Sequence, residues 1–136
     1  MKKILMIGPG RDVRGGISTV VNSYYELGIE KDTEIKYIPT MEDGSQIKKL
    51  IVAVKAYMEF GGCVKKYDIV HVHMAAQASF VRKSLFVQKA KKAGVKVIIH
   101  SHAADFDKYF FEESDDKNRK KIKETFALAD KVIVLS

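Results

Sequence analysis

Five short apolar runs, spread along the chain, constrain its fold more than any other feature. The runs are rich in Ile, Val and Leu, and segments with helical spacing of apolar residues lie between them. They occupy residues 4–7, 34–39, 68–73, 95–100 and 131–135. Apolar strands that alternate with helices are typical of a parallel sheet covered on both faces. The sequence therefore predicts an α/β fold, a Rossmann-like parallel sheet of about five strands with helices on both faces.

The helix after the second run is predicted from a regular apolar stripe. Ser45 is well placed as its N-cap, and the pair Gly61–Gly62 is expected to end it. The stripe consists of Ile47, Leu50, Ile51, Val54 and Met58. Further helices are expected from Ile17 to a stop at Gly28, over about 79–93 and over 116–129, with an irregular aromatic-rich loop at 101–114.

A loop with four glycines and two arginines, residues 8–16, joins the first run to the first helix. Backbone N–H groups and the positive end of a helix dipole attract phosphate in such strand–loop–helix units. Ligands of parallel α/β sheets bind at the carboxyl ends of the strands. The expected site therefore comprises this loop together with Thr40, residues 73–78 and residues 101–107.

The glycine-rich loop departs from the known nucleotide fingerprints. Gly8 and Gly10 match the first two glycines of G-x-G-x-x-G, but Val13 stands where the third belongs. Residues 39–41 offer no acid for a ribose hydroxyl. The sequence therefore disfavours a nicotinamide cofactor, and the lack of G-K-[ST] excludes a P-loop ATPase.

All four histidines belong to two H-x-H pairs, at 71–73 and 100–102. Residues i and i+2 of a strand share a face, so neighbouring pairs could form a zinc site, with Asp105 or Asp107 orienting a ring. In the other interpretation one histidine of each pair packs against a helix and the other reaches the cleft. We expect no metal.

The formal net charge of +7 favours anionic partners, namely phosphorylated ligands, an anionic membrane face or nucleic acid, although a solvated lysine-rich surface is equally compatible. The single cysteine, Cys63, excludes an intrachain disulfide and fits a reducing cytoplasm. The apolar run at 4–7 is too short for a signal peptide, so none is expected, and no stretch reaches the ~18 apolar residues that a membrane span needs. We expect a cytoplasmic protein, peripheral at the inner face of the cell membrane.

Five segments, in this order, resemble the amino-terminal domain of family-4 glycosyltransferases of the GT-B architecture, which build bacterial surface polysaccharides. They are residues 15–20, 67–73, 79–85, 96–106 and 129–136. The resemblance implies a retaining, metal-free enzyme without a cofactor, with two Rossmann-like domains around a cleft. Residues 1–136 would form the single acceptor-side domain. They would hold half of an active site and would lack the donor-binding domain that supplies the other half.

The resemblance also implies roles for individual residues. Gly15 and Gly16 map to the glycine pair that approaches the donor diphosphate, and His102 to the catalytic histidine near the donor sugar. The family usually has Gly or Asp after this histidine. This chain has Ala103, which leaves the role of Asp105 open.

An anionic acceptor such as a lipid diphosphate is expected to contact Arg82 and Lys83, with a solvated surface as the alternative for these two side chains. His73 and Asp105 complete the expected acceptor contacts. The aromatic loop 106–111 and the basic helix that follows it predict a contact with an anionic membrane surface. The alternative is a core-facing aromatic cluster beside a charged helix face.

The sequence thus predicts the acceptor-binding domain of a glycosyltransferase that transfers a sugar from a nucleotide-sugar to a cell-surface polysaccharide or lipid-linked acceptor. The other expected partner is a carboxy-terminal domain or a partner chain, and nucleic acid is not expected. Two alternatives stay open. One is a stand-alone module that binds a nucleotide or a partner, and the other is a metal-dependent hydrolase that uses the H-x-H pairs.

Overall fold

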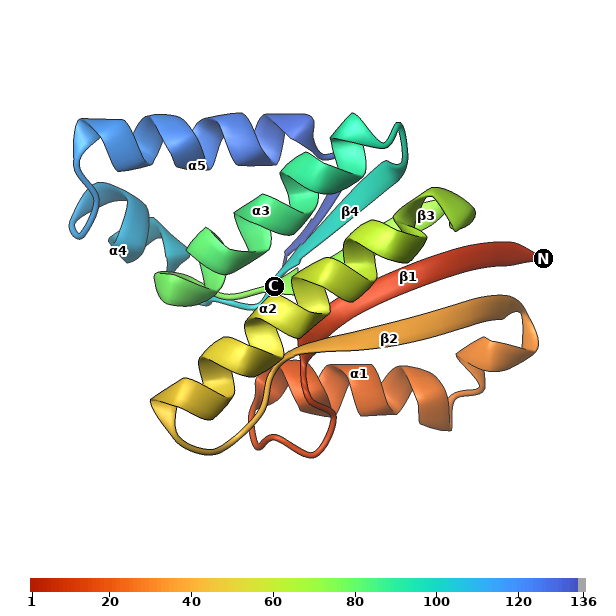
Figure 1. Cartoon of the computed structure of the whole chain (residues 1–136). Coiled ribbons are helices and arrows are strands. Elements are labelled where there is room, and N and C mark those ends of the chain that lie inside the picture. The colour runs from red at the N-terminus through yellow and green to blue at the C-terminus, as the bar shows by residue number, and fades with distance from the viewer. Residues whose placement is uncertain (135–136) are drawn as a thin grey trace.

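A computed structural model describes residues 1–134 and contains a five-stranded parallel sheet flanked by helices (Figure 1). The strand order is β2-β1-β3-β4-β5. The strands are β1 (Lys2–Pro9), β2 (Thr33–Met41), β3 (Ile69–Met74), β4 (Lys96–Ser101) and β5 (Lys131–Val134). The helices are α1 (Gly16–Glu26), α2 (Gln46–Cys63), α3 (Ala78–Lys92), α4 (Phe106–Phe111) and α5 (Asp116–Leu128), with short 3-10 turns at Ile29–Lys31 and Val64–Lys66. The predicted α/β, Rossmann-like class is confirmed.

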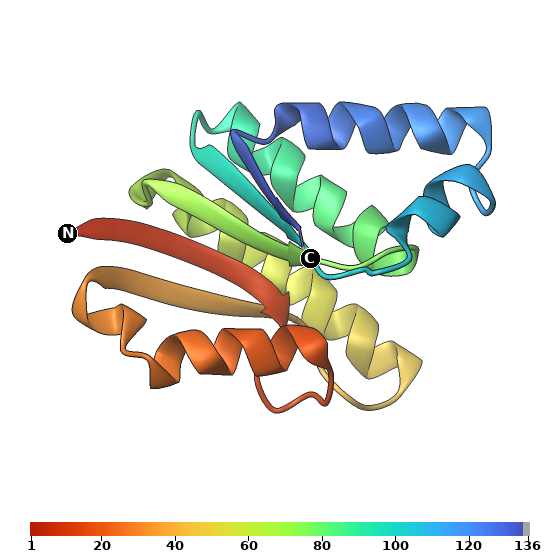
Figure 2. The same ribbon diagram turned by 180° about the vertical axis from the view of Figure 1, so that it is seen from behind.

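Helices cover both faces of the sheet. In Figure 1, α2 and α3 lie over one face with α5 beside α3, and the view from behind in Figure 2 places α1 over the opposite face. Strand residues alternate between these faces. Val70 and Val72 of β3 enter the core with Phe60 of α2 and Phe80 of α3, all fully buried. His71 and His73, which alternate with these two valines on β3, face α1 and lie beside the ring of Tyr24.

Residues 101–114 are more ordered than the sequence predicts. The expected irregular loop contains α4, whose Phe106 and Tyr109, one helical turn apart, pack against Phe80 of α3. The core-facing alternative is therefore correct for these two aromatic side chains. The predicted last strand reached Leu135, which lies outside the described residues, as does Ser136.

Helix α2 also differs from its prediction, because it continues through Gly61 and Gly62 to Cys63. The predicted N-cap is confirmed: the Ser45 hydroxyl accepts a hydrogen bond from the backbone N–H of Lys48 at 3.2 Å. Glycine lowers helix propensity by about 1 kcal/mol but does not end a helix that is held by packing. Here Phe60, directly before the pair, is fully buried and anchors the last turns.

Candidate functional site

A pocket of about 340 Å³ lies at the carboxyl ends of the strands, where the site was expected. It opens between the glycine-rich loop, the first turn of α1 and the start of α3. The predicted residues that line it are Gly15, Gly16, Arg82, Lys83 and His102. The glycine pair and the basic pair, expected to serve donor and acceptor respectively, therefore surround one pocket.

The glycine-rich loop is held on α1 by side-chain hydrogen bonds. The Ser18 hydroxyl donates to the carbonyl of Gly10 at 3.0 Å, and the Asn22 amide donates to the carbonyl of Arg11 at 3.0 Å. The Arg11 guanidinium donates back to Asn22 at 2.8 Å and lies over the Tyr25 ring. These contacts fix the loop so that the first turn of α1 faces the pocket.

The early and late glycines of the loop have different roles. A Cβ at Gly10 would collide with the Glu42 carboxylate, and one at Gly8 would collide with the Tyr37 hydroxyl, so these two glycines permit close packing. Gly15 is the N-cap of α1 with φ +152, a conformation that favours glycine. A Cβ at Gly16 would meet nothing within 4 Å, so the space beside the helix start is open to a ligand. The first N–H groups of a helix lack intrahelical partners and point into such a space.

Replacing Gly16 by Ala is expected to separate binding from folding. Alanine fits the α1 backbone, so thermal unfolding should occur at an unchanged or slightly higher temperature. Its methyl group projects beside the free N–H groups, and pyrophosphate affinity measured by calorimetry should fall by about tenfold, the equivalent of one weakened charged hydrogen bond. Gly62→Ala is the control, since Gly62 also has open space but lies far along the chain in α2. Equal affinities for Gly16→Ala and the unmodified protein would argue against ligand contact at this helix start.

Lys83 is the most unusual residue of the pocket. It is only 3% exposed, yet no hydrogen bond or ion pair of its ammonium is found among residues 1–134. Burial, with a smaller effect from the neighbouring positive charge of Arg82, lowers the pKa of Lys83 to about 7. The alternative that the side chain lies on a solvated surface is therefore excluded for Lys83, whereas Arg82 is half-exposed. A buried lysine that lines a pocket is suited to an anionic ligand, because the negative charge of the ligand would favour the protonated ammonium.

His102 joins the pocket to a group of buried histidines. Its backbone N–H donates to the carbonyl of Met74 at 2.8 Å, which fixes the loop after β4. Its Nε2 atom lies 2.9 Å from Nδ1 of His73. Burial, and then His100, lower the pKa of His102 to about 4, so the ring is neutral at neutral pH.

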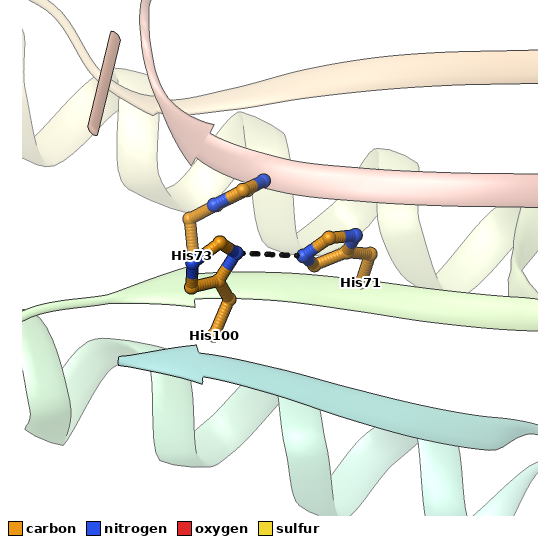
Figure 3. Close-up of side chains that lie close together, drawn as sticks. All are labelled: His71, His73 and His100. Atoms are coloured by element: carbon orange, nitrogen blue, oxygen red, sulfur yellow. Dashed lines mark hydrogen bonds between the residues drawn. The ribbon is translucent and has the colours of Figure 1, made fainter. Parts of the chain in front are cut away.

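The four histidines form one layer beneath α1. Nε2 of His71 lies 3.3 Å from Nδ1 of His100, and the hydroxyl of Tyr24 lies 3.4 Å from the same Nδ1 atom. Figure 3 shows the His71 and His100 rings pointing toward each other across β3 and β4, with His73 above them. Burial is the main cause that lowers the pKa values of His71 to about 4 and of His73 to about 2.

Three of these rings could hold a metal ion. Nitrogen atoms of His71, His73 and His100 all lie within 4.8 Å of one another, and the neutral imidazole is the form that binds metals. The separation of 3.3 Å between His71 and His100 equals the edge of a tetrahedron with bonds of about 2.0–2.1 Å, the usual zinc–imidazole distance. The Nε2 atom of His73 is buried and has no hydrogen-bond partner among residues 1–134.

Three predicted site residues, His73, Asp105 and Thr40, do not line the pocket. His73 is fully buried in the histidine layer and is separated from the pocket by His102. Asp105 is exposed at the start of α4, lines no part of the pocket and does not orient a histidine ring. Thr40 is also buried, and its hydroxyl donates to the carbonyl of Gly8. Arg14 and Ser79 line the pocket but were not singled out, although Arg14 belongs to the predicted loop.

Comparison with known proteins supports the fold alone. No protein-family model and no curated protein matches the chain. A solved structure of a pilus assembly-related protein from Burkholderia pseudomallei is similar over 98% of this chain and 78% of that chain, with 12% identity and a TM-score of 0.50. A 2-deoxyribosyltransferase from Bacillus psychrosaccharolyticus is similar over 95% of this chain and 97% of that chain, with 14% identity and a TM-score of 0.47.

Proposed function

We propose that this chain is the acceptor-side domain of a glycosyltransferase that uses a nucleotide-sugar donor and a lipid-linked or glycan acceptor. The observation that carries the proposal is the pocket in which buried, unpaired Lys83 lies with the free start of α1. Glycosyl transfer from a nucleotide-sugar releases a diphosphate, whose charge must be stabilised as the bond breaks. Helix N–H groups can provide that stabilisation without a metal, and the desolvated ammonium of Lys83 in the same pocket can bind the phosphate of a lipid-linked acceptor.

His102 is suited to donate a hydrogen bond into the pocket. The buried Nε2 of His73 has no partner in the described part of the chain, and an unprotonated nitrogen is less costly to leave unpaired than an N–H group. We therefore assign the His73 proton to Nδ1, which donates to Nε2 of His102 at 2.9 Å. Neutral His102 then carries its proton on Nδ1 and can donate it to a phosphate or sugar oxygen. In this arrangement His73 is a positioning residue rather than a ligand contact.

Calorimetric titration of the purified chain tests this function. A short-chain prenyl diphosphate should bind saturably and be displaced by pyrophosphate, because both would place phosphate in the same pocket. Nucleotide-sugars with that prenyl diphosphate should give no transfer product with this chain alone. Binding of mononucleotides without any binding of the prenyl diphosphate would favour a nucleotide-binding module, and turnover by the isolated chain would contradict the half-site proposal.

A metal-dependent hydrolase is the second candidate, favoured by the close approach of His71, His73 and His100. Equilibrium dialysis against zinc separates the two proposals. The glycosyltransferase proposal expects no stoichiometric zinc. One zinc ion per chain, lost in both His71→Gln and His100→Gln variants that keep the folded circular dichroism spectrum, would favour the hydrolase.

A further inference from the structure

The apolar stripe of α2 points away from the core. An amphipathic helix normally packs this stripe against the sheet. Here its residues are instead largely solvent-exposed, with Ile47 at 72%, Leu50 at 65% and Met58 at 70%. The core contacts of α2 come from another side of the helix, through Ala56 and Phe60. The most regular apolar pattern of the chain is therefore a surface feature.

The exposed stripe continues onto α3. Val81 and Leu85 of α3 are also exposed, and an apolar groove of about 230 Å³ runs between the two helices. Val54, Met58 and Leu85 line this groove together with the stem of Arg82. We call this surface of α2 and α3 the α2–α3 face. Contiguous exposed apolar patches of this kind mark interaction sites.

The charge of these helices indicates the kind of partner. Their sequences contain a single acidic residue, Glu59, whose carboxylate is paired with Lys36 at 2.7 Å. Lys83 of α3 is buried and Lys91 is ion-paired with Asp130 at 2.9 Å. The basic residues that remain on the two helices are Lys48, Lys49, Lys55, Arg82, Lys89 and Lys92. A second copy of the chain would bring the same excess of positive charge to the contact, and the two copies would repel each other. An apolar stripe flanked by lysines instead matches an anionic lipid surface, which accepts the apolar side chains and attracts the cations.

We propose that the α2–α3 face docks on a bilayer that contains anionic phospholipids, with α2 lying in the plane of the interface. No helix among residues 1–134 is long and apolar enough to cross a membrane, so the contact is peripheral. This docking rests on exposure and charge and does not depend on the proposed function. The two fit together through Arg82, which borders both the apolar groove and the anion pocket. A lipid-linked phosphate could then reach the pocket from the membrane surface.

The docking face differs from the aromatic loop that the sequence predicted as the membrane contact. Phe106 and Tyr109 of that loop are packed against Phe80, which leaves Phe111 as its strongly exposed aromatic residue, at 68%. Phe111 borders a basic surface of α5 that includes Arg119 and Lys123. This second surface therefore provides a matched control for the first.

Tryptophan substitution tests the docking face directly, because the chain contains no tryptophan. Leu50→Trp places a single reporter in the stripe, and Phe111→Trp places one on the control surface. With vesicles of equal parts phosphatidylglycerol and phosphatidylcholine, we expect a blue shift of the Leu50→Trp emission and its quenching by brominated lipid. Phe111→Trp should show neither effect. Leu50→Trp should bind pure phosphatidylcholine vesicles at least about tenfold more weakly than the anionic vesicles. High salt should weaken its binding to the anionic vesicles to the same extent.

Removal of the stripe gives the second measurement. The triple variant Ile47→Ser, Leu50→Ser, Met58→Ser changes only exposed side chains, so its circular dichroism and thermal unfolding should match those of the unmodified chain. Its partition coefficient on the anionic vesicles should fall at least about tenfold. Unchanged vesicle binding, or loss of binding in Phe111→Ser instead, would overturn the proposal. So would light scattering that shows dimers which the triple variant dissociates. The triple variant should bind pyrophosphate with the same affinity as the unmodified chain. The two measurements therefore distinguish a loss of vesicle binding from a loss of anion binding in the pocket.

Discussion

Replacing Lys83 by Met is expected to weaken pyrophosphate binding by roughly 10- to 150-fold while making the ligand-free protein more stable. The loss of affinity corresponds to one buried hydrogen bond to a charged group, about 1.5–3 kcal/mol. The gain in stability is expected because Lys83 is only 3% exposed and its ammonium has no anionic partner within the described residues. A methionine of similar length keeps the packing of α3 without that cost.

Calorimetry and urea unfolding of the same two proteins measure both effects. Lys92→Met is the control, because Lys92 is exposed at the far end of α3 and should change neither quantity. Burial holds the pKa of Lys83 at about 7, below that of the unfolded chain, so the folded protein binds fewer protons. The stability of the ligand-free protein should therefore increase as the pH rises above 7, and Lys83→Met should remove this dependence. A variant that binds pyrophosphate normally would show that Lys83 is only a structural residue.

Acidification is expected to destabilise the metal-free protein well before its carboxylates are protonated. Burial lowers the pKa of His71 from 6.5 to about 4, so the folded state favours the neutral ring. This stabilisation is complete above pH 6.5 and is lost as the pH falls toward 4. At pH 5, the loss of this stabilisation at His71 alone should lower the free energy of unfolding by about 2 kcal/mol. His102 acts in the same direction, with a smaller effect because it is only half-buried.

Urea unfolding at pH 7.5, 6 and 5 in the presence of a chelator measures this loss. His71→Gln removes the titrating group and retains an amide near the position of Nε2, so its unfolding free energy should depend less on pH than that of the unmodified chain. A free energy of unfolding that stays constant between pH 7.5 and 5 would show that the histidine layer is accessible to solvent or already charged.

The central strands could be predicted from the sequence because burial on both sides leaves an unambiguous apolar signal. The run 68–73 and strand β3 (Ile69–Met74) agree closely, as do 95–100 and β4 (Lys96–Ser101). The edge of the sheet at which the candidate pocket lies followed from the same signal, since the carboxyl ends of parallel strands meet there. Helix α4 was missed because its six residues are too few to show a helical period, and no side chain caps its N terminus.

The orientations of the helices could not be predicted in this way. Apolar spacing showed that α2 has an apolar stripe, but not that Ala56 and Phe60 provide its core contacts while Leu50 is exposed. Likewise, Arg82 and Lys83 are neighbours in the sequence, and only the packing of α3 determines which one is buried in the pocket. His71 and His73 share a face of β3, as the i, i+2 spacing predicted. The spacing could not show that His102 covers His73, because this contact depends on the loop after β4.

Titration of isotope-labelled protein with pyrophosphate, followed by two-dimensional NMR, is the most direct test of the proposed anion pocket. We expect saturable shifts of the backbone amides of Gly15 and Gly16, with smaller shifts around Lys83 and His102, and no such shifts in Lys83→Met. Saturable shifts confined instead to the basic surface of α5 around Arg119 and Lys123, or no saturable shift at all, would contradict the assignment of the site.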